Sequence, residues 1–132
     1  MIFQYLRVSS TISRPIIDII VKSKDKFAIY PILIDSGADY CIFHLELAQS
    51  FGIKLSTTTV KFYGVSKKKV IGRWGEVELK IDGYTYKTMV LFAKMTHFDH
   101  GILGQLGFFD HFDVKISYHK QTIEIDSIKP SN

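Results

Sequence analysis

The sequence predicts a small domain that is mostly β. Short apolar or alternating runs recur along the chain, turn residues separate them, and only two segments have helix-forming composition. The 132 residues are enough for one domain, and a hydrophobic content of 46% can support a real core. We therefore expect a single domain over residues 1–132, without internal repeats or linkers.

Three apolar runs in the first part of the chain read as strands. They are Ile2–Val8, Ile16–Val21 and Lys26–Ile34. Pro31 has no N–H group for a ladder hydrogen bond, so it must lie at an edge, a bulge or a strand end. Leu45–Phe51 has the composition of a helix, and Gly52 is placed as its C-terminal stop.

A β-hairpin is expected in the middle of the chain. Thr57–Tyr63 and Val70–Ile81 flank the polar centre Ser66–Lys69, and apolar and charged residues alternate in the second arm. Asp82–Gly83 predicts a tight turn in which both central residues have positive φ. Tyr84–Phe92 then returns as the partner strand.

The last quarter of the chain predicts one short helix and two more strands. Gln105–Phe109 is the expected helix, near the carboxyl end. Phe112–Ser117 and Thr122–Ile125 read as strands joined by a turn over Tyr118–Gln121. Lys129–Asn132 has the composition of a frayed end.

Charge and composition set limits on partners and compartment. The 17 basic and 13 acidic residues leave a net charge of +4, too little to indicate nucleic acid unless it is clustered. The single cysteine, Cys41, excludes an internal disulfide framework and weakly favours a reducing compartment. The first residues lack signal-peptide features, and no run approaches the roughly 20 apolar residues of a membrane span. We expect a cytoplasmic protein without membrane or nucleic-acid partners, and the initial methionine mildly favours a free-standing gene product over a polyprotein fragment.

Asp35-Ser36-Gly37-Ala38 is the most informative motif. It follows the apolar run Phe27–Ile34 directly, so a carboxylate stands beside a glycine at the end of a strand that reads as buried. Carboxylates in such positions are candidates for acid–base chemistry. Far downstream, Ile102-Leu103-Gly104 brings a second apolar pair into a glycine.

Together these segments resemble the retropepsin-like aspartic proteases, which are the retroviral proteases and their single-domain bacterial and eukaryotic relatives. The resemblance is strong over Ile29–Ile53 and Gly101–Ile125, and Gly107–Val114 is closest to bacterial relatives. It implies an all-β, closed β-barrel-like acid-protease domain with one short helix near the carboxyl end. It also implies a homodimer that hydrolyses extended, largely apolar segments of peptides or proteins, without a metal or other cofactor.

The chain carries the motif once, which gives a monomer half of an active site. Asp126-Ser127 is followed by Ile128 instead of glycine. A two-fold dimer would bring Asp35 of each copy together, and two carboxyls that share one proton can activate water. The resemblance also implies a homodimer. The alternative is a catalytically silent dimer of the same fold that binds peptides or assembles complexes.

The resemblance assigns roles along the motif. Asp35 is the catalytic residue, and the hydroxyl of Ser36 bonds across the dyad. Gly37 lets the backbone turn and approach substrate, and Ala38 is the small residue of the motif. Asp39 corresponds to an aspartate that helps to hold the substrate main chain, and its alternative role is that of a solvated turn acid.

Ile102 belongs to the substrate-binding set and, with Leu103 and Gly104, packs behind the catalytic loop. The retroviral proteases usually have arginine after this glycine, whereas this chain has Gln105. A neutral amide can bond to Asp39 but cannot form a bidentate ion pair, which bears on the stiffness of the interface.

The hairpin over Lys61–Trp74 is the candidate flap, the segment that closes over bound peptide. Its tip is expected near four residues, namely Gly64, Val65, Ser66 and Lys67. Gly64, Val65 and Ser66 are expected to contact substrate. The alternative is an ordinary exposed hairpin with solvated lysines.

Three other signals have weaker functional interpretations. His97–His100, with His111 and Asp113 nearby, could suggest a metal site, but the spacing favours a polar loop and we expect no metal. Lys67–Lys69 and the neighbouring aromatics could suggest single-stranded nucleic acid, although strand aromatics are more often core residues. Cys41 is expected to pack behind the catalytic loop. Finally, the dimer interface is expected to include the terminal strands, around residues 2–6 and 122–125.

Overall fold

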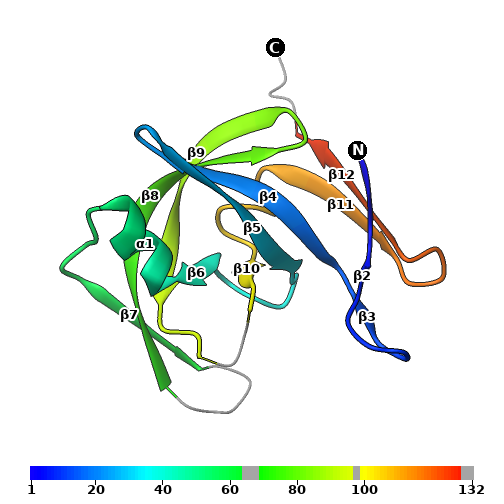
Figure 1. Cartoon of the computed structure of the whole chain (residues 1–132), viewed down its shortest axis with the longest axis horizontal. Helices are drawn as coiled ribbons and strands as arrows, with labels where there is room; N and C mark the ends of the chain where they lie inside the picture. Colours follow the sequence, from blue (N-terminus) through cyan, green and yellow to red (C-terminus); the bar gives the residue numbers. More distant parts are fainter. Residues whose placement is uncertain (64–68, 97–98, 129–132) are drawn as a thin grey trace.

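The computed structural model describes residues 1–63, 69–96 and 99–128, and within them twelve strands and one helix. Six strands form a closed ring, the body of the molecule (Figure 1). In ring order they are β4 (Ile16–Ser23), β5 (Lys26–Ile34), β10 (Gly101–Leu103), β6 (Ile42–His44), β9 (Tyr84–Ala93) and β8 (Lys69–Ile81). Pairing of β8 with β4, through Val21 and Leu79, closes the ring. The predicted closed β-barrel is therefore confirmed.

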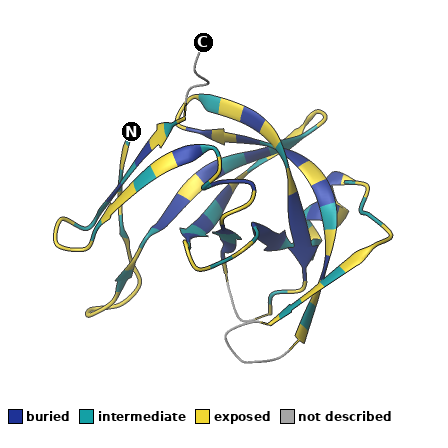
Figure 2. Ribbon diagram, turned by 180° about the vertical axis from the view of Figure 1, so that it is seen from behind, coloured by how far each residue is buried: buried dark blue, intermediate teal, exposed yellow. Residues whose placement is uncertain are grey.

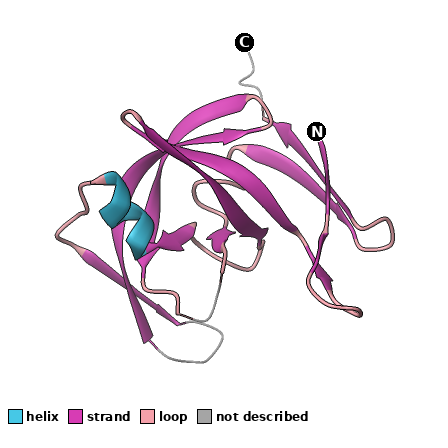
Figure 3. Cartoon of the chain, in the orientation of Figure 1, coloured by secondary structure: helices cyan, strands magenta, loops and turns pink. Residues whose placement is uncertain are grey.

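The remaining elements flank this barrel (Figure 3). Strand β7 (Thr59–Tyr63) extends β8 beyond the ring, and helix α1 (Leu45–Phe51) follows β6. A separate three-stranded sheet has the order β1 (Ile2–Gln4), β12 (Thr122–Ser127), β11 (Phe112–Ser117), and β2 (Leu6–Arg7) pairs only with β3 (Ser13–Arg14). No helix among the described residues is long and apolar enough to cross a membrane.

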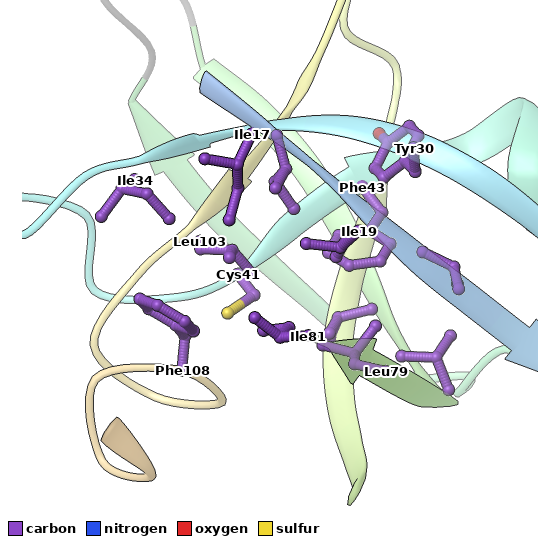
Figure 4. Packing of buried hydrophobic residues seen from close by; sticks show 14 of the residues in the cluster. Ile17, Ile19, Tyr30, Ile34, Cys41, Phe43, Leu79, Ile81, Leu103 and Phe108 are labelled. Atoms are coloured by element: carbon purple, nitrogen blue, oxygen red, sulfur yellow. The ribbon is translucent and has the colours of Figure 1, made fainter. Parts of the chain in front are cut away.

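Alternation of side chains along the strands builds the core. In β8, Val77, Leu79 and Ile81 are buried whereas Glu76 and Lys80 are exposed, as the sequence pattern predicts. Figure 2 shows this alternation of buried and exposed residues along the long strands. Figure 4 shows the core itself, with side chains from β4, β5, β6, β8 and β10 pointing toward one another.

The two predicted glycine turns are confirmed. Asp82 and Gly83 have φ values of 45° and 89°, so the β8–β9 turn has the positive φ values that we expected. Gly52 ends α1 in the left-handed region, at φ 67°, and its N–H donates to carbonyl groups of the last turn. Pro31 lies where β5 is paired with β4 alone, because β10 pairs with β5 only from Ile32 onward.

The prediction of a helix over Gln105–Phe109 is wrong. Residues 105–111 form turns, and the one helix in the described residues is α1, in the first half of the chain. Gly107 has φ 102°, which no right-handed helix accommodates, and the Asp110 side chain accepts the N–H of Gly107 at 3.0 Å. The Asp110 N–H donates to the carbonyl of Gln105, which is five residues back instead of the four of an α-helix.

Thr122–Ile125, where we expected part of the dimer interface, is not a free strand edge. These residues lie in β12, which is paired with β1 on one side and β11 on the other. Only β1 and β11 are edge strands of this sheet. A second copy could therefore extend the sheet at β1 or β11, but not at β12.

Candidate active site

Strand order places a loop over the end of β10. Strand β10 lies between β5 and β6, parallel to β5 and antiparallel to β6. The chain leaves β5 at the same end at which it enters β6, so the loop over residues 35–41 must cross the end of β10. Asp35 begins this loop, and its N–H donates to the carbonyl of Leu103 at 3.0 Å. The residue at the end of the buried strand is thus fixed by the neighbouring strand.

Backbone groups hold the Asp35 carboxylate. The N–H of Gly37 donates to Asp35 Oδ1 at 3.0 Å, and the N–H of Ala38 donates to the Asp35 carbonyl at 3.2 Å. Among the described residues, the bond from Gly37 is the only hydrogen bond to the carboxylate. Asp35 is half-buried, while Ser36 and Gly37 are exposed beside it. The second carboxylate oxygen is therefore available to a water molecule or to another group.

Gly104 lets the two segments of the site cross in close contact. The N–H of Gln105 donates to Ala38 O at 2.9 Å, and the N–H of Leu106 donates to Asp39 O at 3.0 Å. A Cβ atom on Gly104 would lie 2.3 Å from Tyr40 O and 2.6 Å from Ala38 O. Only glycine fits here, which gives the Ile-Leu-Gly segment a physical reason for its third residue.

The Gln105 side chain bonds to a different partner from the one that we expected. Its Nε2 group donates to the Ser36 carbonyl at 3.0 Å and not to Asp39. This bond links residue 36, next to the candidate catalytic residue, to the segment after β10. The neutral amide of Gln105 therefore restrains the loop by a hydrogen bond to the backbone of Ser36, and not by an interaction with the Asp39 carboxylate.

Cys41 lies behind the loop, as predicted. Its side chain is fully buried, and Sγ accepts the N–H of Gly104 at 3.4 Å. Burial raises the pKa of the Cys41 thiol to about 12, so the thiol is protonated at neutral pH. It is a packing residue and not a nucleophile.

An apolar cluster lies next to the loop. Ile42, Leu91 and Ala93 are its buried centre, and half-buried side chains surround them. The surrounding residues are Tyr40, Val60, Phe62, Val70, Trp74, Met95 and Ile102. Tyr40 and Trp74 meet edge to face, with ring centroids 5.5 Å apart, which joins the loop to β8. We did not single out this pair from the sequence, because the two residues are far apart in the chain.

The structure brings together some of the predicted site residues. Asp35, Ser36, Gly37, Ala38 and Asp39 form one loop, with Asp39 exposed. Ile102 lies on β10 beneath it, paired with Leu33 and Ile42.

The predicted flap is described only in its arms. Strands β7 and β8 pair from Thr59 with Arg73 to Tyr63 with Lys69, so the hairpin is confirmed. The expected tip, Gly64 to Lys67, lies outside the described residues. So does His97 of the alternative metal site, and within the described part of the chain no three His, Cys, Asp or Glu side chains are grouped as metal ligands.

Two solved structures are similar to this chain. The chain is similar in structure to the EIAV protease in its complex with the inhibitor HBY-793. The TM-score is 0.58 at 20% identity, over 75% of this chain and 88% of that one, which shows a shared fold. A retropepsin-like aspartic protease from Rickettsia conorii aligns with a TM-score of 0.47 at 17% identity, over 87% of this chain and 94% of that one.

No curated protein sequence matches the chain. A family profile does, and the family is described as aspartyl protease. It matches residues 21–105, more than half of the 132 residues, and this range includes β5, the loop with Asp35 and β10. The chain belongs to the aspartyl protease family.

Proposed function

We propose that the chain is an aspartic endopeptidase that acts as a homodimer, with Asp35 of each copy in one catalytic dyad. The observation that carries this proposal is the loop itself. It holds one carboxylate, by one backbone N–H, at the end of β5, and the chain supplies one such motif. A second copy related by a two-fold axis supplies the other carboxylate.

The chemistry follows from two carboxyls that share one proton. Like charges about 3 Å apart do not both ionise readily, so one carboxyl stays protonated. The unprotonated carboxylate takes a proton from a water molecule, and the oxygen of this water attacks the peptide carbonyl carbon. At the same time the other carboxyl protonates the carbonyl oxygen. The resulting gem-diol then collapses and the C–N bond breaks. The leaving nitrogen takes the proton that the first carboxyl removed from water, and the second carboxyl takes a proton from a gem-diol hydroxyl, which restores the shared proton.

The surroundings of the loop support an extended, largely apolar peptide segment as substrate. The cluster around Ile42 and Leu91 offers half-buried apolar side chains on the hairpin side of the loop. Asp39 is exposed beside it and can accept hydrogen bonds from a substrate main chain. A peptide bound as a strand would use main-chain hydrogen bonds for affinity and such pockets for specificity.

Digestion of a peptide library, read by mass spectrometry, tests the proposal directly. New termini that appear with the wild type but not with an inactive variant support an endopeptidase. Binding of peptides without any cleavage would favour the silent module of the same fold.

Activity should depend on protein concentration, because one chain has one motif. We expect specific activity to fall on dilution through the dimer dissociation constant, in step with the dimer fraction measured by sedimentation. Asp35→Asn chains added in excess should lower wild-type activity by forming mixed dimers, whereas an unrelated protein at equal concentration should not. A fully active monomer would contradict the proposal.

The dependence of cleavage rate on pH should be bell-shaped, with its optimum on the acid side of neutrality. The alkaline limb reports loss of the shared proton, and the acid limb reports protonation of the second carboxyl. The profile should be recorded well above the dimer dissociation constant, so that dissociation does not distort it.

Inhibitors provide the control for this chemistry. A statine-type compound, whose hydroxyl mimics the tetrahedral intermediate, should stop cleavage and stabilise the dimer. Iodoacetamide should have no effect, because burial keeps the Cys41 thiol protonated and inaccessible. A rate that rises steadily to alkaline pH and is abolished by a thiol reagent or a chelator would refute the mechanism.

A further inference from the structure

A short arm projects from the barrel between β1 and β4 (Figure 1). The arm, residues 6–14, consists of β2 and β3 and the turn between them. Leu6 pairs with Arg14 and Arg7 with Ser13, and the N–H of Val8 donates to Ile12 O at 2.8 Å. The ribbon is therefore closed by its own hydrogen bonds.

One face of the arm is apolar and exposed. Residues two apart on a strand, and residues directly opposite across an antiparallel pair, have their side chains on the same face. Leu6, Val8, Ile12 and Arg14 therefore share one face. The three apolar side chains are 49%, 50% and 48% exposed. An isolated two-stranded ribbon is only marginally stable in water. Burial of these three apolar side chains against another surface would therefore stabilise the arm.

The arm ends beside the candidate catalytic residue. The N–H of Ile34, the residue before Asp35, donates to the carbonyl of Pro15 at 2.9 Å, directly after the arm. A dimer that brings the two Asp35 residues together must therefore bring both arms close to its interface. This step rests on the proposed function, which requires that the two loops meet.

An open hollow lies against the same loop. It has a volume of about 470 Å³ and is lined by Ser36, Gln105, Leu106, Phe109 and Asp110. The side chain of Leu106 is 54% exposed, although it lies next to the tightly packed crossing at Gly104. The exposure of the arm shows that it does not pack into the hollow of its own chain.

Charge complements this apolar match. Arg14 lies on the apolar face, residues 5–15 contain no acidic residue, and the hollow includes Asp110. Within the described residues, neither Arg7 nor Arg14 takes part in a salt bridge. Strand β12 is already paired on both edges, so the terminal sheet offers the second copy less than we expected from the sequence.

We propose that the apolar face of each arm packs into the hollow of the other copy. The contact is reciprocal, as a two-fold axis requires, so each dimer has two such contacts. Each arm then supports the loop of the other copy, because Ser36 and Gln105, which line the hollow, are joined to each other by a hydrogen bond. The arm is thus a positioning element of the dimer, and it contacts neither substrate nor the reacting atoms.

Crosslinking tests the contact directly. The chain has one native cysteine, Cys41, which is fully buried and leaves the surface free of thiols. In the variant Val8→Cys, Leu106→Cys, a short bismaleimide should link two chains and double the mass on a denaturing gel. The matched control is Arg7→Cys with Leu106→Cys, because Arg7 is exposed and, one residue before Val8, lies on the opposite face of the arm. Equal linking in both variants, or links only within one chain, would overturn the proposal.

Dissociation constants separate this proposal from the proposed function. Val8→Asp should raise the dimer dissociation constant at least about tenfold, since each dimer loses two apolar contacts. Ser13→Asp, which adds the same charge on the opposite face of the arm, should change it by less than about twofold. If Val8→Asp dimerises as tightly as the wild type while the wild type cleaves only as a dimer, the arm contact is refuted and the proposed function stands. If the wild type cleaves as a monomer, both are refuted.

Discussion

Asp35→Asn should abolish peptide cleavage, lowering the rate by at least about 10²–10⁴-fold. General acid–base assistance is typically worth that much, and the substitution removes it from both copies of the dimer at once. The amide has nearly the shape of the carboxyl, and its oxygen can still accept the N–H of Gly37 that holds the side chain now. The loss should therefore appear in kcat, measured with a peptide substrate, while the fold and the dimer persist.

A carboxylate elsewhere on the chain provides the matched control. Asp113 is exposed on β11, away from the loop, and Asp113→Asn removes the same charge. It should cleave at the wild-type rate. The thermal unfolding midpoint of Asp35→Asn should be equal to or above that of the wild type, because the two amides remove the repulsion that arises whenever both carboxyls ionise. An Asp35→Asn protein that cleaves as fast as the wild type would show that Asp35 is not the catalytic residue.

The parts of the fold that sequence predicts well are those set by local chemistry. The second half of β8 follows from the alternation of apolar and charged residues over 76–81, since a half-buried strand has a period of two. The turn at Asp82–Gly83 and the helix stop at Gly52 follow from residues that adopt positive φ. The loop at Asp35 belongs with these, because its acid, its glycine and its apolar strand are adjacent in the chain.

The parts that sequence does not predict depend on distant neighbours. Strands β6 and β10 have three residues each, too few for a period of their own, and they exist because each pairs with strands on both sides. Gln105–Phe109 has helix-forming residues, but Gly107 at φ 102° and its bond to Asp110 fix turns instead. Burial of β12 between β1 and β11 is equally a tertiary result.

The candidate site shows the same division. The carboxylate and its loop can be recognised from the motif, but the bonds that hold the loop cannot. The contact of Gln105 with Ser36 and that of Tyr40 with Trp74 join segments that are far apart in the sequence. Gly104 is the exception, because the glycine can be recognised in the sequence and the structure shows why it is needed: a Cβ atom there would clash with the backbone of residues 38 and 40.

Among the glycines of the described residues, Gly104 should be the one at which substitution by alanine is most damaging. The added Cβ would lie 2.3 Å from Tyr40 O and 2.6 Å from Ala38 O, and both are backbone atoms that no rotamer change can move. Overpacking typically costs about 1–3 kcal/mol, and we expect a loss at or above the top of that range in free energy of unfolding, measured by urea denaturation. Relief of the clash must displace the loop that carries Asp35, so cleavage should fall even where the variant is folded.

Gly52→Asn is the control that separates a steric clash from loss of glycine as such. Gly52 has φ 67°, a conformation that asparagine tolerates, and a Cβ atom there meets nothing within 4 Å. This variant should unfold within about 1 kcal/mol of the wild type and retain full activity. If Gly104→Ala were equally stable and equally active, the close crossing of residues 38–41 with Gly104 would not be what positions Asp35, and the catalytic loop would have to be held by the Leu103 and Gln105 hydrogen bonds alone.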